Sequence, residues 1–262
     1  CLVGSEMCIR DRTVAAIFSA NDIKLYLFTD LRATPEVSFA VRHLNCHCGI
    51  VLTASHNPPE YNGYKVYWQD GGQIVPPQDN GIISAIKNTA YEAILFDAKP
   101  ALITPIDHAI DEAFQDASVA VGRIGNGNRE KIKVVFTPLH GTSVTAIPQV
   151  LEKAGYKHVS IIEEQAKPDG DFPTVKSPNP EEPEALQMAM EKANAIGADI
   201  VIGTDPDADR LGIAVRNENN ELELLNGNQA MVAMTDFILS KGNYTAEENP
   251  FVGSTVVSTP MM

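Results

Sequence analysis

Short apolar segments alternate with longer amphipathic segments along most of the chain, and this alternation restricts the possible folds more than any other feature. The apolar segments that we predict to be β-strands are residues 23–28, 48–53, 64–68, 132–136, 159–162, 199–202, 211–215 and 222–225. The segments with a helical spacing of apolar residues are 35–44, 80–87, 106–121, 144–154, 184–196 and 227–240. Such alternation is typical of α/β proteins. We therefore predict a multi-domain α/β protein whose mixed or largely parallel sheets are covered by helices.

A short polar segment divides this pattern. Residues 125–128 are Gly-Asn-Gly-Asn, a composition that favours turns and linkers, and a new strand–helix pattern follows them. Domains commonly contain roughly 100–200 residues, so the chain has room for about two. We expect a first domain over residues 13–128, a second over 129–225 and the start of a third over 226–262.

Both ends of the sequence suggest a fragment. Residues 1–12, CLVGSEMCIRDR, lack the basic start and the sustained apolar stretch of a signal peptide. They resemble the translated read-through of a sequencing adapter, so we interpret them as a non-native leader and leave them out of the fold. Residues 251–262 have an apolar strand pattern that stops abruptly. We therefore expect the natural protein to continue.

Charge and cysteine content exclude several classes of partner. The chain has 20 Lys and Arg residues against 34 Asp and Glu residues, which leaves a net charge of −14. Such an acidic surface disfavours nucleic acid or a membrane bound through bulk charge, but it allows a small anionic substrate held by a few local cations. The four cysteines fit neither a zinc site nor a disulfide framework. We expect a reducing, cytoplasmic location, with Cys46 and Cys48 packing at the start of a strand.

Three carboxylates follow the apolar segment 199–202 at alternate positions. They belong to the sequence DPDADR and are Asp205, Asp207 and Asp209. A loop held open by Pro206 allows all three to surround one ion, and carboxylate oxygens favour a hard cation such as Mg²⁺ or Ca²⁺. An EF-hand is excluded, because this sequence has arginine where that loop needs glycine and glutamate. The alternative is a solvated acidic turn without an ion.

Two further polar loops also come directly after apolar segments. The first, TASHNPPEYNGYKVY, begins at residue 53 and contains Ser55, His56, Asn57 and Lys65. Its serine lacks the glycines of a hydrolase nucleophile elbow, and a plain polar turn is the alternative. The second, TPLHGT, contains His140 and opens a helical segment, where backbone N–H groups can hold a phosphate. Its alternative is a strand–helix connection with an internally hydrogen-bonded histidine.

Together these loops resemble the α-D-phosphohexomutases, the phosphoglucomutase/phosphomannomutase family. TASHNPPEYNGYKVY is similar to that family's active-site serine loop, and DPDADR is similar to its metal loop. TPLHGT and the sequence PDGDFPTVKSPNPEEPEAL at residues 168–186 resemble its second domain. The similarity runs from about residue 24 to the end of the chain. It implies four α/β domains around a central cleft, of which this sequence would hold most of the first, all of the second and the start of the third.

The resemblance implies a mechanism and a role for each residue. It assigns Ser55 as the phosphorylated serine, with Mg²⁺ bound by Asp205, Asp207, Asp209 and an oxygen of the phosphorylated Ser55. The phosphoryl group would pass to a sugar monophosphate, form a bisphosphosugar such as glucose 1,6-bisphosphate, and thereby interconvert 1-phospho and 6-phospho sugars. Arg210 would contact phosphate, and Lys65 would carry the sugar proton with a pKa lowered by burial beside the ion. We further expect His56 and Asn57 to orient the serine loop and His140 to bind substrate.

Two other functions stay open from the residues alone. Asp205-x-Asp207 is similar to the first motif of phosphatases with an aspartyl nucleophile, although Asp209 stands where that motif expects Thr or Val. Alternatively, the chain is an inactive fragment that acts only as a folded scaffold. The resemblance favours glucose, while mannose, glucosamine and a pentose stay open because the sugar-recognition loop would follow residue 262. The sequence does not determine the oligomeric state.

Overall fold

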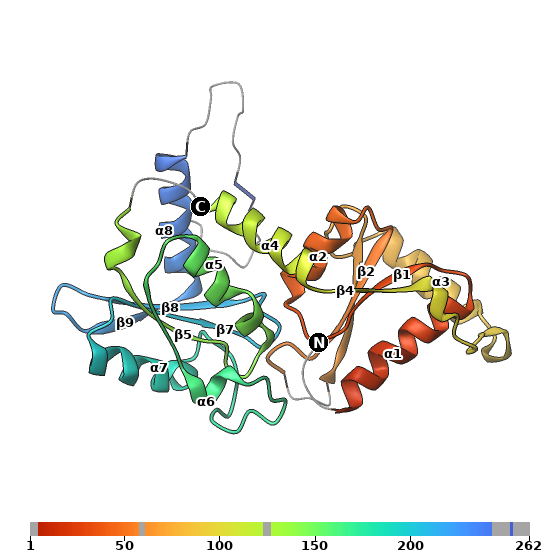
Figure 1. Ribbon diagram of the computed structural model, residues 1–262, viewed down its shortest axis with the longest axis horizontal. Helices are drawn as coiled ribbons and strands as arrows, with labels where there is room; N and C mark the ends of the chain where they lie inside the picture. The colour runs from red at the N-terminus through yellow and green to blue at the C-terminus, as the bar shows by residue number, and fades with distance from the viewer. Residues whose placement is uncertain (1–4, 58–60, 123–126, 243–251, 254–262) are drawn as a thin grey trace.

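The computed structural model describes residues 5–57, 61–122, 127–242 and 252–253, and it folds into two α/β units joined through a helix (Figure 1). The first unit contains two two-stranded sheets, and the second contains a five-stranded sheet. The five-stranded sheet has both parallel and antiparallel strand pairs. These features confirm the predicted α/β class with mixed sheets and helices. None of the described helices is long and apolar enough to cross a membrane.

The first unit holds its strands in two separate pairs. One pair is parallel, with Leu25 opposite Ile103, and the other is antiparallel, with Val51 opposite Lys65. Helix α2 packs on β2 through a small core that joins Val41, Val51 and Tyr67. The elements of this unit are α1 (Ser5–Ala20), β1 (Leu25–Phe28), α2 (Thr34–His43), β2 (Cys48–Thr53), β3 (Gly63–Trp68), α3 (Gln78–Asn88), β4 (Ile103–Ile106) and α4 (His108–Val121).

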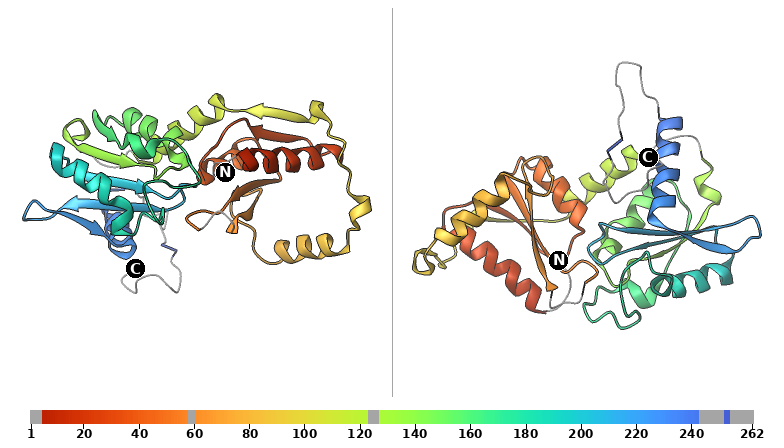
Figure 2. Two further views of the ribbon diagram at one scale, coloured as in Figure 1. Left: turned by 90° about the horizontal axis from the view of Figure 1, so that it is seen from below. Right: turned by 180° about the vertical axis from the view of Figure 1, so that it is seen from behind.

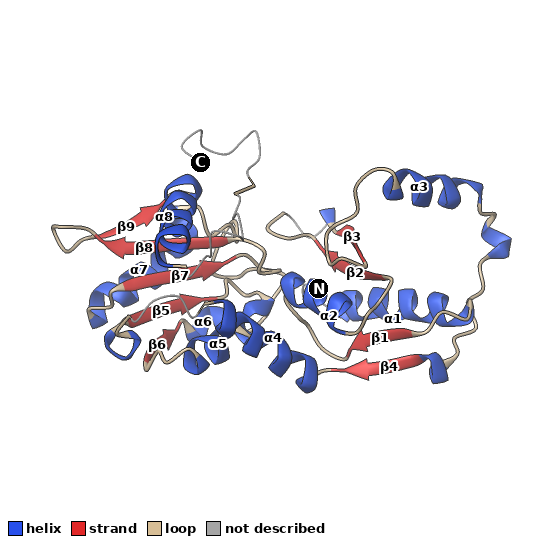
Figure 3. Cartoon of the chain, turned by 90° about the horizontal axis from the view of Figure 1, so that it is seen from above, coloured by secondary structure: helices blue, strands red, loops and turns tan. Residues whose placement is uncertain are grey.

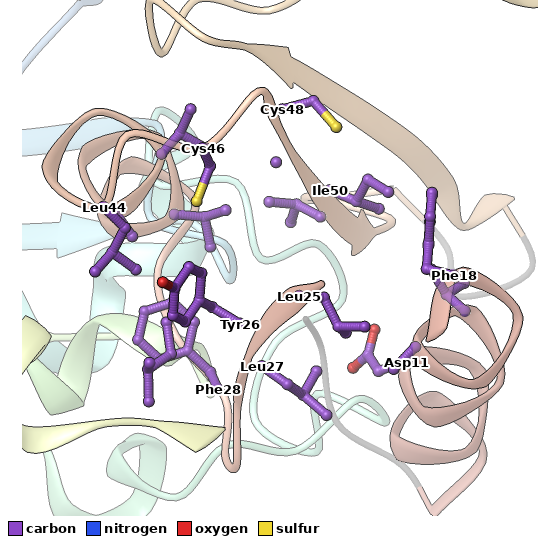
Figure 4. Close-up of a pocket in the computed structure, with 18 of the residues that line it drawn as sticks. Asp11, Phe18, Leu25, Tyr26, Leu27, Phe28, Leu44, Cys46, Cys48 and Ile50 are labelled. Atoms are coloured by element: carbon purple, nitrogen blue, oxygen red, sulfur yellow. The ribbon is translucent and has the colours of Figure 1, made fainter. Parts of the chain in front are cut away.

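A cavity of about 390 Å³ lies between the two strand pairs of the first unit. Residues from α1, β1, α2 and β2 line it, and most of the lining is apolar. Figure 4 shows Leu25 and Leu27 of β1 facing this space, with Ile50 of β2 on the other side and Phe18 of α1 at its edge. Cys46 and Cys48 both line it. Cys46 is partly buried, whereas Cys48, at the start of β2, is exposed, so the expected packing holds for Cys46 and only in part for Cys48.

The second unit is built on a sheet with the strand order β6-β5-β7-β8-β9. The pairs β5–β6 and β5–β7 are parallel, and the pairs β7–β8 and β8–β9 are antiparallel. Helix α7 covers one face of this sheet, and α5 and α8 cover the other (Figures 1 and 2). The elements of this unit are β5 (Lys133–Thr137), α5 (Ile147–Lys153), β6 (His158–Ile161), α6 (Glu163–Ala166), α7 (Pro183–Ile196), β7 (Ile200–Thr204), β8 (Leu211–Arg216), β9 (Leu222–Leu225) and α8 (Gly227–Lys241).

Small residues let α7 pack closely on the central strands of this sheet. Ala189 and Ala193 of the helix are fully buried against Val135 and Val201 of the two central parallel strands. Gly203 completes this packing, because a Cβ atom there would lie 2.3 Å from the Leu186 side chain. The close packing fixes β7, and therefore also fixes the loop that leaves its carboxyl end (Figure 3).

Local sequence signals explain where several helices begin and end. Proline stands in the first turn of α2, α5 and α7, where its missing N–H group leaves no helical hydrogen bond broken. Gly197 ends α7 in the left-handed conformation, with a φ of 62°. Asn226 and Gln229 form a reciprocal capping box at the start of α8. For α2, α7 and α8 these signals account for the close agreement of the observed helix bounds with the predicted segments.

Three expectations about the fold need correction. Helix α1 begins at Ser5, so the described part of the segment left out as a leader belongs to a helix. The helix expected over residues 106–121 begins at His108, and the strand β4 ends just before it. The helix expected over residues 144–154 is a short 3₁₀ turn followed by α5.

Two of these differences have a physical reason. Helix α1 is only weakly amphipathic, and β4 is stabilised by pairing with β1, so a local periodicity of apolar residues indicates neither element. Apart from 252–253, the C-terminal strand pattern lies outside the described residues.

Candidate active site

The aspartate loop lies at the carboxyl end of β7, where α/β sheets commonly place ligands. Each of Asp205, Asp207 and Asp209 offers a carboxylate oxygen, and these oxygens lie within 4.8 Å of one another. Asp205 and Asp207 are fully buried, and Asp209 is exposed. Ala208 has a φ of 61°, a left-handed conformation that turns the chain so that the three carboxylates converge. The loop therefore gathers negative charge at one point instead of displaying it to solvent.

The serine loop reaches the aspartates from the first unit. Strand β2 ends at Thr53, whose hydroxyl accepts a hydrogen bond from the Ser55 backbone N–H at 2.8 Å. Ser55 has a φ of 54°, and its hydroxyl Oγ donates to Asp205 Oδ2 at 2.9 Å. A left-handed conformation is uncommon for serine and is held here by the surrounding contacts. The nucleophile candidate and the metal-loop candidate are thus in direct contact.

Lys65 joins the same group of residues from β3. The antiparallel register of β2 and β3 carries the chain back beside the serine loop and places Lys65 opposite Val51. Its Nζ atom lies 2.9 Å from Asp207 Oδ2 and 2.9 Å from Asp209 Oδ2. The Lys65 side chain is 21% exposed and therefore partly shielded from water. The first unit consequently contributes the Ser55 hydroxyl and the Lys65 ammonium, among other groups, to the aspartate loop of the second.

Burial and charge shift the ionisation of these groups in opposite directions. Burial, followed by the neighbouring Asp207 carboxylate, raises the pKa of Asp205 to about 7. Burial also disfavours ionised Asp207, but the hydrogen bond from Lys65 outweighs it and lowers the pKa of that carboxyl. Burial alone would lower the pKa of Lys65, yet its bonds to Asp207 and Asp209 raise it instead. The pKa depression expected for Lys65 is therefore not found among these partners.

The three aspartates fit a divalent cation of the Mg²⁺ type. Asp207 Oδ1 is buried and has no hydrogen-bond partner among the described residues, which is costly for a charged oxygen unless it binds a ligand. The Lys65 ammonium is the cation that contacts this group, and it pairs with Asp207 and Asp209. All three groups offer oxygen, the atom that hard cations prefer. The donor set and its orphaned oxygen thus match the expected metal site.

Three other predicted residues lie around this group. His56 Nδ1 is 3.2 Å from Ser55 Oγ, and burial together with Arg210 lowers the pKa of His56. Asn57 is exposed, and its backbone N–H donates to the Ala54 carbonyl, which closes the turn after Ser55. Arg210 donates its backbone N–H to Asp205 Oδ1 at 2.9 Å, and its side chain is exposed. These contacts leave the Arg210 guanidinium accessible to an anion.

The structure does not bring His140 into contact with these residues. Its Nε2 atom lies 2.8 Å from Thr174 Oγ1, and its Nδ1 atom lies 3.3 Å from the Lys167 carbonyl oxygen. The side chain is buried, with 2% of its surface exposed. His140 therefore fixes the polar segment that contains residues 168–186, as the alternative of an internally hydrogen-bonded histidine expects.

The residues after His140 support the aspartate loop through hydrogen bonds, a role that was not predicted from the sequence. Thr142 donates both its backbone N–H and its hydroxyl to the Pro206 carbonyl, at 2.8 Å and 3.0 Å. Ser143 Oγ lies 2.6 Å from Thr204 Oγ1 at the end of β7. The only sequence signal for this role is that both loops follow predicted strands, which allows them to meet at one sheet edge.

Comparisons with known proteins agree with this arrangement of fold and site. The family model for phosphoglucomutase/phosphomannomutase alpha/beta/alpha domain I matches residues 5–93, and the model for domain II matches residues 112–219. These two matches correspond to the two α/β units of the structure, and the serine loop and the aspartate loop lie within the matched residues. The chain belongs to the phosphoglucomutase/phosphomannomutase family.

Individual relatives are phosphohexose mutases by name. A phosphoglucomutase from Staphylococcus epidermidis is 40% identical over 82% of this chain and 40% of its own length. A phosphoglucomutase from Staphylococcus haemolyticus is 36% identical over 88% of this chain and 42% of its own length. A crystal structure described as a putative phosphomannomutase from Thermus thermophilus aligns with a TM-score of 0.69 and 25% identity, over 88% of this chain and 50% of that one. The chain thus spans about 40% of the length of these curated relatives.

Proposed function

We propose that this chain carries the phosphotransfer half of a phosphohexose mutase, which interconverts 1-phospho and 6-phospho hexoses. The contact that supports this proposal most strongly is the 2.9 Å hydrogen bond from Ser55 Oγ to Asp205 Oδ2, across 150 positions of sequence. A hydroxyl fixed beside a group of carboxylates is a suitable acceptor and donor of a phosphoryl group once a cation balances the charge.

The proposed reaction moves one phosphoryl group out and another back. The bond between phosphorus and Ser55 Oγ breaks as a bond forms from phosphorus to a sugar hydroxyl, and the hydroxyl proton passes to Ser55 Oγ. Lys65 is the proposed carrier of that proton: as an ammonium it would give a proton to Ser55 Oγ and take up the proton of the sugar hydroxyl in its place. Its positive charge lies at the same aspartate loop. The resulting bisphosphosugar then returns its other phosphoryl group to Ser55. We propose glucose 1,6-bisphosphate as this intermediate.

Asp205, Asp207 and Asp209 are the proposed ligands of Mg²⁺, together with an oxygen of phosphorylated Ser55. When bound, the ion neutralises charge on the transferring phosphoryl group. His56 keeps the Ser55 hydroxyl oriented, because the lowered pKa favours a neutral ring that can exchange a hydrogen bond with Oγ. The exposed Arg210 guanidinium has the planar, bidentate geometry suited to phosphate. Asn57 holds the turn that follows Ser55.

We propose glucose 1-phosphate and glucose 6-phosphate as the substrates. The staphylococcal relatives, which are 36% and 40% identical to this chain, are named phosphoglucomutases. The net charge of −14 gives no support to a nucleic-acid or membrane partner, and a phosphosugar needs only the local cations Lys65 and Arg210. A cytoplasmic location, expected from the cysteine content, stays part of this proposal.

The contacts of Asp205 favour a mutase over a phosphatase with an aspartyl nucleophile. A nucleophilic carboxylate needs a free oxygen directed at phosphorus. Asp205 Oδ2 instead accepts the Ser55 hydroxyl, and Oδ1 accepts the Arg210 backbone N–H.

Intact-mass spectrometry tests this function directly on the chain. After incubation with MgCl₂ and glucose 1,6-bisphosphate, we expect the mass to increase by one phosphoryl group, and peptide mapping should place it on Ser55. Ser55→Ala should abolish the increase, while Ser38→Ala, which changes another partly buried serine of the same unit, should retain it. Phosphate found on Asp205, or labelling of the Ser55→Ala variant, would instead support the phosphatase mechanism.

A further inference from the structure

Asp207 accepts three hydrogen bonds from the first unit of the protein. Its main-chain carbonyl accepts the Thr34 backbone N–H at 2.8 Å. Its Oδ2 atom accepts the Thr34 hydroxyl at 3.3 Å and the Lys65 ammonium at 2.9 Å. Its Oδ1 atom is buried without a hydrogen-bond partner in the described part of the chain. The two oxygens of the Asp207 carboxylate therefore have different environments: Oδ2 accepts two hydrogen bonds, and Oδ1 is available to a ligand.

Thr34 occupies a position that suits it to hold a carboxylate. It is the first residue of α2, it is 2% exposed, and it lies 173 positions from Asp207 in sequence. The first N–H groups of a helix have no partner inside the helix, and the partial positive charge there attracts an anion. Pro35 follows and fixes the helical conformation of the first turn. The start of α2 thus directs a backbone donor and a hydroxyl donor at one aspartate.

The start of α2 is itself firmly anchored. Arg32 donates to both oxygens of Asp111 at 2.7 Å and 3.0 Å, and to Asp107 at 3.2 Å, which ties it to the first turns of α4. Four residues after Thr34, the Ser38 hydroxyl donates to the Gly71 carbonyl at 2.6 Å and holds the middle of the helix. Because Arg32 anchors the chain two residues before Thr34, the position of the Thr34 hydroxyl is fixed before any ion binds. The Ser38 bond lies a full turn further along and holds the body of the helix, not this hydroxyl.

We propose that Thr34 is a positioning residue for divalent-ion binding, and that it holds Asp207 so that Oδ1 points at the ion. The proposal rests on the proposed metal site of the preceding section. Thr34 does not touch the ion. Its hydroxyl and Lys65 occupy Oδ2, and its backbone N–H fixes the main chain of the loop, so the carboxylate cannot rotate to exchange its two oxygens. Partners of this kind orient metal ligands in many proteins, and their loss commonly weakens metal affinity about 10–100-fold.

Titration with Mn²⁺, followed by the paramagnetic signal of the free ion, tests this role on the full chain. We expect Thr34→Val, which keeps the shape and the backbone bond but loses the hydroxyl, to weaken Mn²⁺ binding by about tenfold. Thr34→Ala should do the same, whereas Thr34→Ser should restore the affinity nearly to that of the wild type. Ser38→Ala is the matched control on the same helix, and it should lower the thermal unfolding midpoint without changing Mn²⁺ affinity.

The outcomes separate this inference from the proposed function. If the wild type binds one Mn²⁺ and Thr34→Val binds it equally well, Thr34 has no positioning role and the inference is wrong. If Ser38→Ala weakens Mn²⁺ binding as much as Thr34→Val does, the effect comes from general loosening of α2 and the inference is again overturned. If the wild type binds no ion and Asp207→Asn changes nothing, the metal site of the proposed function fails, and the inference fails with it.

Discussion

Gly141 lies directly against Pro206, and a Cβ atom at this glycine would be 2.4 Å from Pro206 Cα and 2.6 Å from the Pro206 carbonyl oxygen. The backbone of Gly141 has a φ of −102°, which other residues also adopt. Glycine is therefore required here by the close approach of two loops and not by its own conformation. Through this contact the TPLHGT loop sets the position of the aspartate loop.

Substituting Gly141 with alanine should move the aspartate loop. Both clashing atoms belong to backbone, so they cannot relax by rotating a side chain, and we expect a loss of about 1–3 kcal/mol in the free energy of unfolding. We also expect weaker divalent-ion binding, which urea denaturation with and without MgCl₂ will reveal. Gly81→Ala is the control, because nothing lies within 4 Å of a Cβ in that helix, and it should stabilise the chain by about 0.5–1 kcal/mol. Equal stability of Gly141→Ala and wild type would contradict this account.

Addition of Mg²⁺ should stabilise the wild-type chain, because an ion that binds only the folded state shifts the unfolding equilibrium. At a free ion concentration of about 100 times Kd, the expected gain is about 2.7 kcal/mol, or roughly 5–10 °C in Tm. Asp209→Asn removes one carboxylate of the trio at a position that is 34% exposed, so the variant should fold and lose roughly half or more of that gain. Differential scanning calorimetry measures both.

An acidic residue elsewhere provides the control for the metal experiment. Asp236 lies exposed on α8, away from the aspartate loop, and Asp236→Asn should keep the full Mg²⁺-dependent increase in Tm. A Tm that rises equally in Asp209→Asn and in wild type would show that the ion acts through general screening and not through the three aspartates.

Glu36 should make the stability of the chain depend on pH. Burial and the neighbouring Asp111 carboxylate raise the pKa of Glu36 to about 8, despite the opposing charge of Arg32. The unfolded chain releases this proton near pH 4.5, so between the two values only the folded state holds it. The stabilising contribution is therefore fully present below pH 4.5 and is lost as the pH rises through about 8.

Glu36→Gln removes this titration while keeping a neutral side chain of similar shape. We expect its Tm to fall less than that of the wild type between about pH 5 and pH 8, with part of the slope left because the pKa of Asp205 is also raised. Glu184→Gln, which changes an exposed glutamate paired with Lys176, should keep the wild-type slope. The idea is wrong if Glu36→Gln and wild type lose the same stability over this range.

Much of the secondary structure was predictable because its signals are local. The five strands of the second sheet follow from short apolar segments, and α7 follows from its apolar spacing between a first-turn proline and Gly197. Helix α1 and strand β4 were not predicted. The first has little amphipathic periodicity, and the second is stabilised by pairing with β1, far away in the sequence, as in the pair Leu25–Ile103. A partner strand that lies so far away in the sequence cannot be recognised from a local pattern of residues.

The residues of the candidate site also fall into those that local sequence signals predicted and those that they did not. Ser55, Lys65 and the three aspartates were predicted because their chemistry and order in the sequence are distinctive, and the structure brings them together. His140 was expected beside a substrate, but Thr174 and Lys167 engage its ring. Thr34 and Glu36 carried no signal at all, since threonine and glutamate near a helix start are ordinary helix-capping residues.

The α/β class, the family resemblance and the identity of the reactive groups follow from the amino-acid sequence, because all three depend on residue types and short spacings. How those groups are held follows from the folded chain: which oxygen of Asp207 is engaged, how closely Gly141 approaches Pro206, and why buried Glu36 keeps its proton. Hydrogen bonds, close contacts and desolvation all depend on which distant segments meet. Thr34 and Asp207 are 173 positions apart, and no local pattern specifies that they touch.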